Sequence, residues 1–184
     1  MNPQQSFQSI DQKPDWLLPM LTLAIISAVV MIFMMPIMQQ FQIERLMDLR
    51  GISRDQAEEI LQKAWKIQQF TTPIFVLVGT FIVQFVVAFF FYLVGTVFMG
   101  GNVPYIKVVS LWAYTSLAVG IIGLAVRAPI MFAKKTMVVQ TSLVAFLPTD
   151  AKGSLLYKIF GKLDVFVIWQ LVLAVVGFTV IYKF

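Results

Sequence analysis

Residues 72–99 read TPIFVLVGTFIVQFVVAFFFYLVGTVFM, a run that contains no charged side chain. Because an α-helix rises about 1.5 Å per residue, roughly 20 apolar residues cross the ~30 Å hydrocarbon core of a bilayer. Lipid offers no partner to an open strand edge, and a membrane β-barrel would show short alternating segments instead of a continuous apolar run. The stretch therefore predicts a membrane-spanning α-helix, with Gln84 as its most polar interior residue.

Three further apolar runs, at residues 16–38, 105–133 and 165–181, have the same character. Of the 184 residues, 59% are hydrophobic and only 12% are charged. Soluble domains are usually about 45–50% apolar, so the surplus apolar surface must face lipid. We expect a single all-α domain over residues 1–184: a polytopic membrane helix bundle with four transmembrane helices, here called spans one to four in chain order.

The first long connection carries an amphipathic pattern over residues 53–70. Ser53 and Gln56 form a predicted capping box, and acidic residues in the first turns followed by lysines match the helix macrodipole. Before it, Gly51 has the character of a helix C-cap. We therefore expect span one to continue as one helix to about Arg50, and a separate amphipathic interfacial helix to follow.

The other non-spanning segments divide into three kinds. Residues 154–163 place apolar side chains on one side and Lys158 and Lys162 away from it, which is typical of an amphipathic helix in the headgroup layer. Residues 100–104 predict a tight turn that makes spans two and three an antiparallel hairpin. The polar residues 1–15 are expected to lie on the surface.

Lys and Arg are concentrated in the two long connections and at the end of span three, whereas the opposite side holds only Lys13, Lys107 and Lys183. The positive-inside rule then places the long connections in the cytoplasm and both termini outside. The alternative is that these charges are solvated helix faces with no bearing on orientation. The net charge of +5 favours contact with anionic lipid headgroups over nucleic acid.

Catalytic signatures are missing from the sequence. It has no Cys and no His, which excludes thiolate nucleophiles, Cys/His zinc sites and the commonest general base at neutral pH. No phosphate-binding or nucleophile-elbow motif occurs either. We expect no enzyme activity, and no catalytic, cofactor-binding or metal-binding residue.

Small residues recur at helical spacing on spans three and four. Such stripes allow the close backbone approach that drives helix association in lipid. They are expected to pack within this chain or to contact another chain, either a different membrane protein or a second copy. Gln84 and Gln170 are expected either to hydrogen-bond between helices or to line a polar path. The seam candidates are Ala113, Ser116, Gly120, Gly123, Gln170, Ala174 and Gly177.

Arg127 and Asp164 form a candidate intramembrane charge pair. Arg127 lies about two turns before Lys134, and Asp164 opens span four on the same side of the membrane. Charges at this depth are rare and often functional. In the alternative interpretation, Pro129 ends the helix and Arg127 extends its side chain to the interface.

Several short motifs together resemble one protein family. Lys13-Pro-Asp-Trp-Leu-Leu-Pro19 leads into span one, span three contains Ala113-Tyr114, and Leu143-Val-Ala-Phe-Leu147 precedes the last helices. Leu163-Asp164-Val165-Phe166, Trp169 and Gly177-Phe178 follow in span four. In order and spacing these motifs resemble bacterial members of the Ypt-interacting-protein (Yip) domain family, over about residues 7–178.

The resemblance implies a polytopic, non-enzymatic membrane protein. Eukaryotic members act in vesicle trafficking with small GTPases and form complexes with one another, and some bacterial members accompany export systems. Members usually have five spans and a cytoplasmic N-terminus, whereas this sequence shows four spans and a charge pattern that places the N-terminus outside. A missing fifth helix would leave the seam on span four uncovered, so the chain is expected either to be shortened or to be completed by a partner.

The function that we expect is a non-enzymatic membrane scaffold or accessory protein of the bacterial inner membrane, in membrane organisation or in trafficking and export. The alternative is a transporter or channel component, or a small subunit of a larger membrane complex. A water-filled cavity lined by Gln84, Gln170 and Arg127 would favour the alternative. A dry bundle would favour the scaffold.

Overall fold

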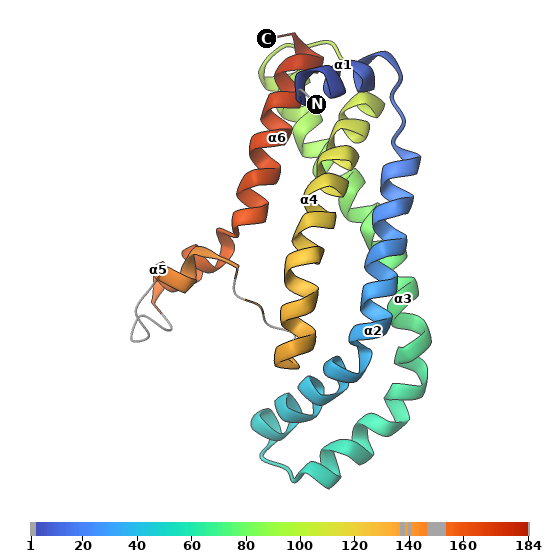
Figure 1. Ribbon diagram of the computed structural model, residues 1–184, viewed down its shortest axis with the longest axis vertical. Coiled ribbons are helices and arrows are strands. Elements are labelled where there is room, and N and C mark those ends of the chain that lie inside the picture. The colour runs from blue at the N-terminus through green and yellow to red at the C-terminus, as the bar shows by residue number, and fades with distance from the viewer. Residues whose placement is uncertain (1–2, 137–138, 140, 147–153, 184) are drawn as a thin grey trace. The chain divides into compact units, whose positions relative to one another are not determined.

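The computed structural model describes residues 3–136, 139, 141–146 and 154–183, and it contains no extended strand among them. Four of its helices are long and apolar enough to cross a membrane, which confirms the predicted fold class. The elements, shown in Figure 1, are α1 (Pro3–Gln12), α2 (Leu17–Arg50), α3 (Arg54–Leu93), the π-helical turn η1 (Val94–Phe98), α4 (Tyr105–Lys134), the 3₁₀ turn η2 (Leu143–Phe146), α5 (Leu155–Lys162) and α6 (Val165–Tyr182).

The contacts group the chain into two compact units, which are described separately below. Unit 1 comprises Met1–Leu23, Phe81–Leu124 and Gln140–Phe184, and unit 2 comprises Ala24–Thr80 and Ala125–Val139.

The first span continues without interruption to Arg50, as predicted, and Pro36 lies inside α2. The helix ends where Gly51 adopts a positive φ of 62° and its N–H donates to the Met47 carbonyl over 2.8 Å. Glycine adopts this left-handed conformation without the steric strain that a Cβ would bring. The helix end is therefore set by a local signal.

The second long helix differs from the prediction at one point. The capping box is confirmed, because the Gln56 N–H donates to Ser53 Oγ (3.4 Å) and the Ser53 N–H donates to Gln56 Oε1 (3.1 Å). The predicted amphipathic helix and span two are nevertheless one helix, α3, with Pro73 inside it. A proline deletes a single backbone donor, and the apolar turns after it favour the helix in lipid, where unpaired backbone groups are costly.

The predicted hairpin between spans two and three is present, with an unforeseen π-helical turn before it. Tyr182 is buried in unit 1, and its hydroxyl lies 3.1 Å from Thr96 Oγ1. Its ring lies against Gly95 and Gly101, so closely that a Cβ on either glycine would overlap the ring. These two glycines therefore make room for the aromatic side chain at the end of α6.

The N-terminal helix α1 packs against α6, near its C-terminal end (Figure 1). Phe7 and Ile10 are buried in a cluster with residues of α4 and α6, and Lys107 Nζ lies 2.5 Å from Asp11 Oδ1. The expectation that residues 1–15 lie on the surface holds for one side of this helix, where Gln8 and Ser9 are exposed, but not for the side that carries Phe7 and Ile10. The two apolar residues are three positions apart, so they share one helix face.

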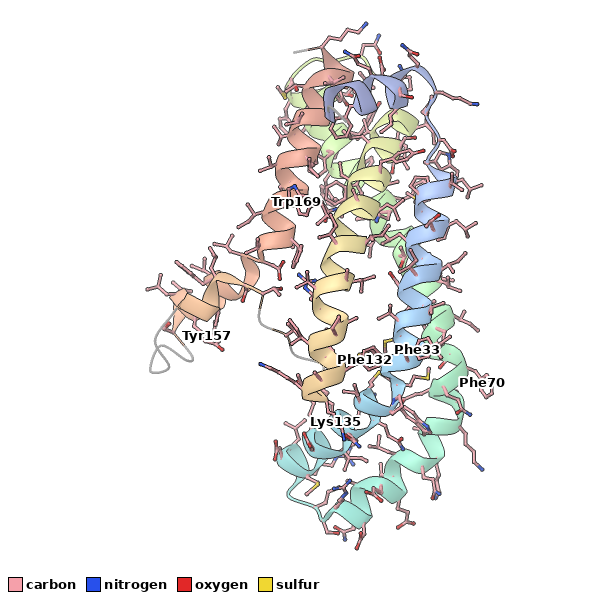
Figure 2. The ribbon with its side chains drawn as sticks, in the orientation of Figure 1. Phe33, Phe70, Phe132, Lys135, Tyr157 and Trp169 are labelled. Carbon is pink, nitrogen blue, oxygen red and sulfur yellow. The ribbon has the colours of Figure 1, made fainter. Side chains whose placement is uncertain are left out.

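Apolar side chains are exposed along all four long helices. Figure 2 shows Phe70 pointing outward from α3, and similarly large apolar residues are exposed on α2, α4 and α6. Soluble monomers rarely expose apolar patches of this extent, whereas a bilayer covers them.

Candidate functional site

A chain of hydrogen bonds joins three helices of unit 1. The Gln170 side-chain amide on α6 donates to Ser116 Oγ on α4 over 2.7 Å. The Ser116 hydroxyl in turn donates to Gln84 Oε1 on α3 over 3.0 Å. Gln84 and Ser116 are each only 6% exposed. We call these three residues the polar junction.

The polar junction uses polar groups that would otherwise lie unpaired among apolar side chains. Ser116 serves as acceptor and donor at once, so one hydroxyl ties α6 to α3 through α4. Interhelical hydrogen bonds of this kind contribute about 1 kcal/mol each in lipid. The sequence indicated interhelical hydrogen bonds for the two glutamines and marked Ser116 as a small residue of a helix seam, but it did not indicate that both glutamines bond to Ser116.

The small-residue candidates pack inside unit 1. Ala113 and Ala174 are fully or almost fully buried. A Cβ on Gly120 would lie 2.8 Å from Leu23 Cδ1, and one on Gly123 would lie 3.6 Å from the Phe166 ring.

The seam on span four is covered by the chain's own elements. A Cβ on Gly177 would overlap the Leu111 side chain of α4 and would lie 2.9 Å from the Phe7 ring of α1. The expectation that this seam is left uncovered is therefore wrong. The contribution of α1 was not expected. Its Phe7 packs where the small residue Gly177 leaves space on α6.

Asp164 lies at the start of α6 and ties it to the preceding connection. Its Oδ1 accepts from the Phe166 N–H over 2.8 Å, which makes it the N-cap, and its Oδ2 accepts from the Thr141 hydroxyl. The Leu143 N–H donates to the Leu163 carbonyl over 3.0 Å. The segments on either side of α5 are thus held together by a short antiparallel bridge.

Arg127 belongs to unit 2 and Asp164 to unit 1, so their proposed charge pair remains a prediction. Helix α4 runs through Pro129 to Lys134. Pro129 therefore does not end the helix, and the extension of the Arg127 side chain to the interface stays a prediction. Arg127 is half-buried on this continuous helix.

Unit 2 contains a helical hairpin, formed by residues 36–66, with a small core of its own. Ile43 from α2 packs with Ala57 and Leu61 from α3. Beside this core lies an open groove of about 550 Å³ between the two helices. One wall carries the acidic residues Asp55, Glu58 and Glu59. Among them Glu58 is paired with Arg54, with Glu58 Oε1 2.7 Å from Arg54 Nε. The groove is lined by Pro36, Gln39, Gln40, Ile43, Arg54, Asp55, Glu58, Glu59 and Gln62.

Four apolar helices and a buried polar junction define a multi-pass helical membrane protein. The chain belongs to the Yip1 domain family, whose family model matches residues 1–184. Proteins of this family are membrane proteins that interact with other proteins, and the family is not known as enzymatic. No curated protein and no solved structure matches the chain.

Proposed function

We propose that this protein is a non-catalytic membrane scaffold or accessory protein that presents the hairpin of residues 36–66 to a protein partner. The observation that carries the proposal is that α2 and α3 are much longer than a bilayer requires and remain paired where their charged residues gather. The membrane that we propose is the bacterial inner membrane, with the hairpin on its cytoplasmic side, as the distribution of Lys and Arg favours.

Helix length supports the projection of the hairpin from the membrane. Helix α3 and the π-helical turn form one helical stretch of 45 residues. At about 1.5 Å per residue the stretch is roughly 68 Å long, more than twice the ~30 Å hydrocarbon core. All of its charged side chains lie between Arg54 and Lys66, so this is the end that water must solvate.

The polar junction argues against a transport path as the main function. A path for polar solutes needs polar groups that face water, whereas Gln84 and Ser116 are buried and bonded to each other. Their geometry suits helix-to-helix attachment within unit 1.

Site-specific photo-crosslinking in cells tests the proposal. A crosslinking amino acid at Gln62, in the groove, should give discrete protein adducts, and one at Val83, which is 59% exposed on the apolar part of α3, should not. Glu59→Lys should abolish the Gln62 adducts by reversing a charge in the groove. Glu44→Lys reverses an exposed charge of the hairpin outside the groove lining and should leave the adducts unchanged.

Two results would reject the scaffold proposal. The first is an identical adduct pattern from Gln62 and Val83 when the variants accumulate equally in the membrane. The second is a solute flux into proteoliposomes that Gln84→Leu abolishes while the bundle stays folded, which would establish the transporter alternative.

A further inference from the structure

The short helix α5 leaves its apolar face uncovered by the described part of the chain. Ser154 caps the helix, with its hydroxyl accepting from the Tyr157 N–H over 3.1 Å. Leu155 is 74% exposed and Leu156 is 59% exposed, and two further apolar residues extend the same exposed face. We call this the α5 apolar face, formed by Leu155, Leu156, Ile159 and Leu163.

The opposite side of α5 is occupied by the chain itself. A Cβ on Gly161, which projects away from the apolar face by helical periodicity, would lie 3.6 Å from Val144 Cγ2. Val144 belongs to η2 and is buried. Because η2 packs on this side, α5 has a defined rotation about its own axis, with its apolar face turned outward.

The location of α5 is fixed by its junction with a spanning helix. Only Leu163 and Asp164 separate it from Val165, where the uncharged helix α6 begins. Figure 1 shows α5 leading sideways from the end of α6 instead of running alongside it. Since α6 crosses the membrane and Asp164 caps its first turn, a helix leaving sideways at this point runs along the membrane surface.

The charge on α5 suits an anionic surface. Lys158 is exposed and lies at the border of the apolar face by helical periodicity, and the described residues of α5 carry no acidic side chain. A lysine at this border reaches headgroup phosphates while the leucines enter the acyl region. We propose that the α5 apolar face inserts into an anionic lipid leaflet, with Lys158 bound to headgroup phosphates. This inference does not depend on the partner proposed for the hairpin.

Fluorescence quenching in nanodiscs tests the inference on the full chain. The sequence contains no Cys, so each single-Cys variant carries one label. A fluorophore on Leu156→Cys should be quenched by lipids that carry a doxyl group high on the acyl chain, and it should be shielded from aqueous iodide. Labels at Gln62, in the hairpin, and at Val83, on the apolar part of α3, provide the aqueous and lipid references.

Lipid charge is tested by comparing phosphatidylglycerol-containing nanodiscs with pure phosphatidylcholine nanodiscs. One lysine near an anionic surface contributes about 1 kcal/mol, so Lys158→Gln should raise the iodide-accessible population about fivefold in the anionic discs only. Lys158→Arg keeps the charge and should have no effect.

Each remaining outcome overturns the inference. Quenching by iodide equal to that at Gln62 would mean that α5 does not insert. Shielding from iodide without doxyl quenching would mean that protein, such as a second copy, covers the face. Equal insertion in both lipid compositions would overturn the requirement for anionic lipid.

Discussion

The Ser116 hydroxyl on α4 accepts a 2.7 Å hydrogen bond from the Gln170 side-chain amide on α6 while it donates to Gln84 on α3. A single oxygen atom thus connects three membrane helices. Replacing Ser116 removes both bonds at once, whereas replacing either glutamine removes one.

Ser116→Ala should lower the free energy of unfolding by about 1–2 kcal/mol, because two interhelical hydrogen bonds are lost. Denaturation in detergent micelles, followed by circular dichroism, measures the change. Ser110→Ala is the matched control, because Ser110 is also buried on α4 but bonds only to the Ile106 carbonyl of its own helix. Equal losses for the two variants would mean that the polar junction adds nothing to helix association.

Gly177→Ala should destabilise the protein by about 1–3 kcal/mol, because the new methyl group would overlap Leu111 and crowd Phe7. Thermal unfolding in detergent gives the comparison. Gly79→Ala is the control, because nothing lies within 4 Å of a Cβ at that position of α3. Should both glycines tolerate alanine equally, the close packing of α6 against α4 and α1 would be refuted.

Gly120→Leu should also lower stability in detergent, although Gly120 is less tightly enclosed than Gly177. The atom nearest to its added Cβ is the end of the flexible Leu23 side chain, at 2.8 Å. A leucine side chain is too large to be accommodated by a shift of the Leu23 methyl group alone. We therefore expect the free energy of unfolding to fall by about 1–3 kcal/mol. Unchanged thermal stability would contradict a packed seam at this position.

Asp164→Ala should be about 1 kcal/mol less stable than Asp164→Asn, because asparagine keeps an oxygen that can accept from the Phe166 N–H. Chemical denaturation of the two variants gives the difference directly. Identical stabilities of the two variants would show that capping of α6 by a side-chain oxygen contributes little.

The proposed Arg127–Asp164 pair predicts non-additive losses. Arg127→Gln and Asp164→Asn each remove one charge and keep a polar side chain of similar shape. If the pair exists, the double variant should lose at least about 0.5 kcal/mol less than the sum of the single losses. If the losses of the two single variants add up to the loss of the double variant, the two side chains do not interact.

Local signals in the sequence specified the helix ends well. Gly51 ends α2, Ser53 and Gln56 cap α3, and Ser154 caps α5, each through contacts within four residues along the chain. The four spans could also be predicted, because their length and lack of charge are properties of single segments. Local spacing is sufficient for features of this kind.

The contacts between distant residues could not be predicted in the same way. Phe7 and Ile10 share one face of a mostly polar segment, but nothing near them in the chain indicates that Phe7 meets Gly177. Tyr182 has the position of an interfacial anchor, yet its burial depends on the space left by Gly95 and Gly101. The continuity of α3 through Pro73 was also missed, since proline ordinarily disfavours the helix interior.

We propose that the single helix α3 is embedded in lipid along its apolar part and projects into water along its charged part. Maleimide labelling of single-Cys variants, in membranes opened so that the reagent reaches both faces, tests it most directly. We expect Gln62→Cys to react at once, whereas Val83→Cys should react only after the bilayer is dissolved and the protein unfolded. Rapid labelling at both positions in intact bilayers would contradict it.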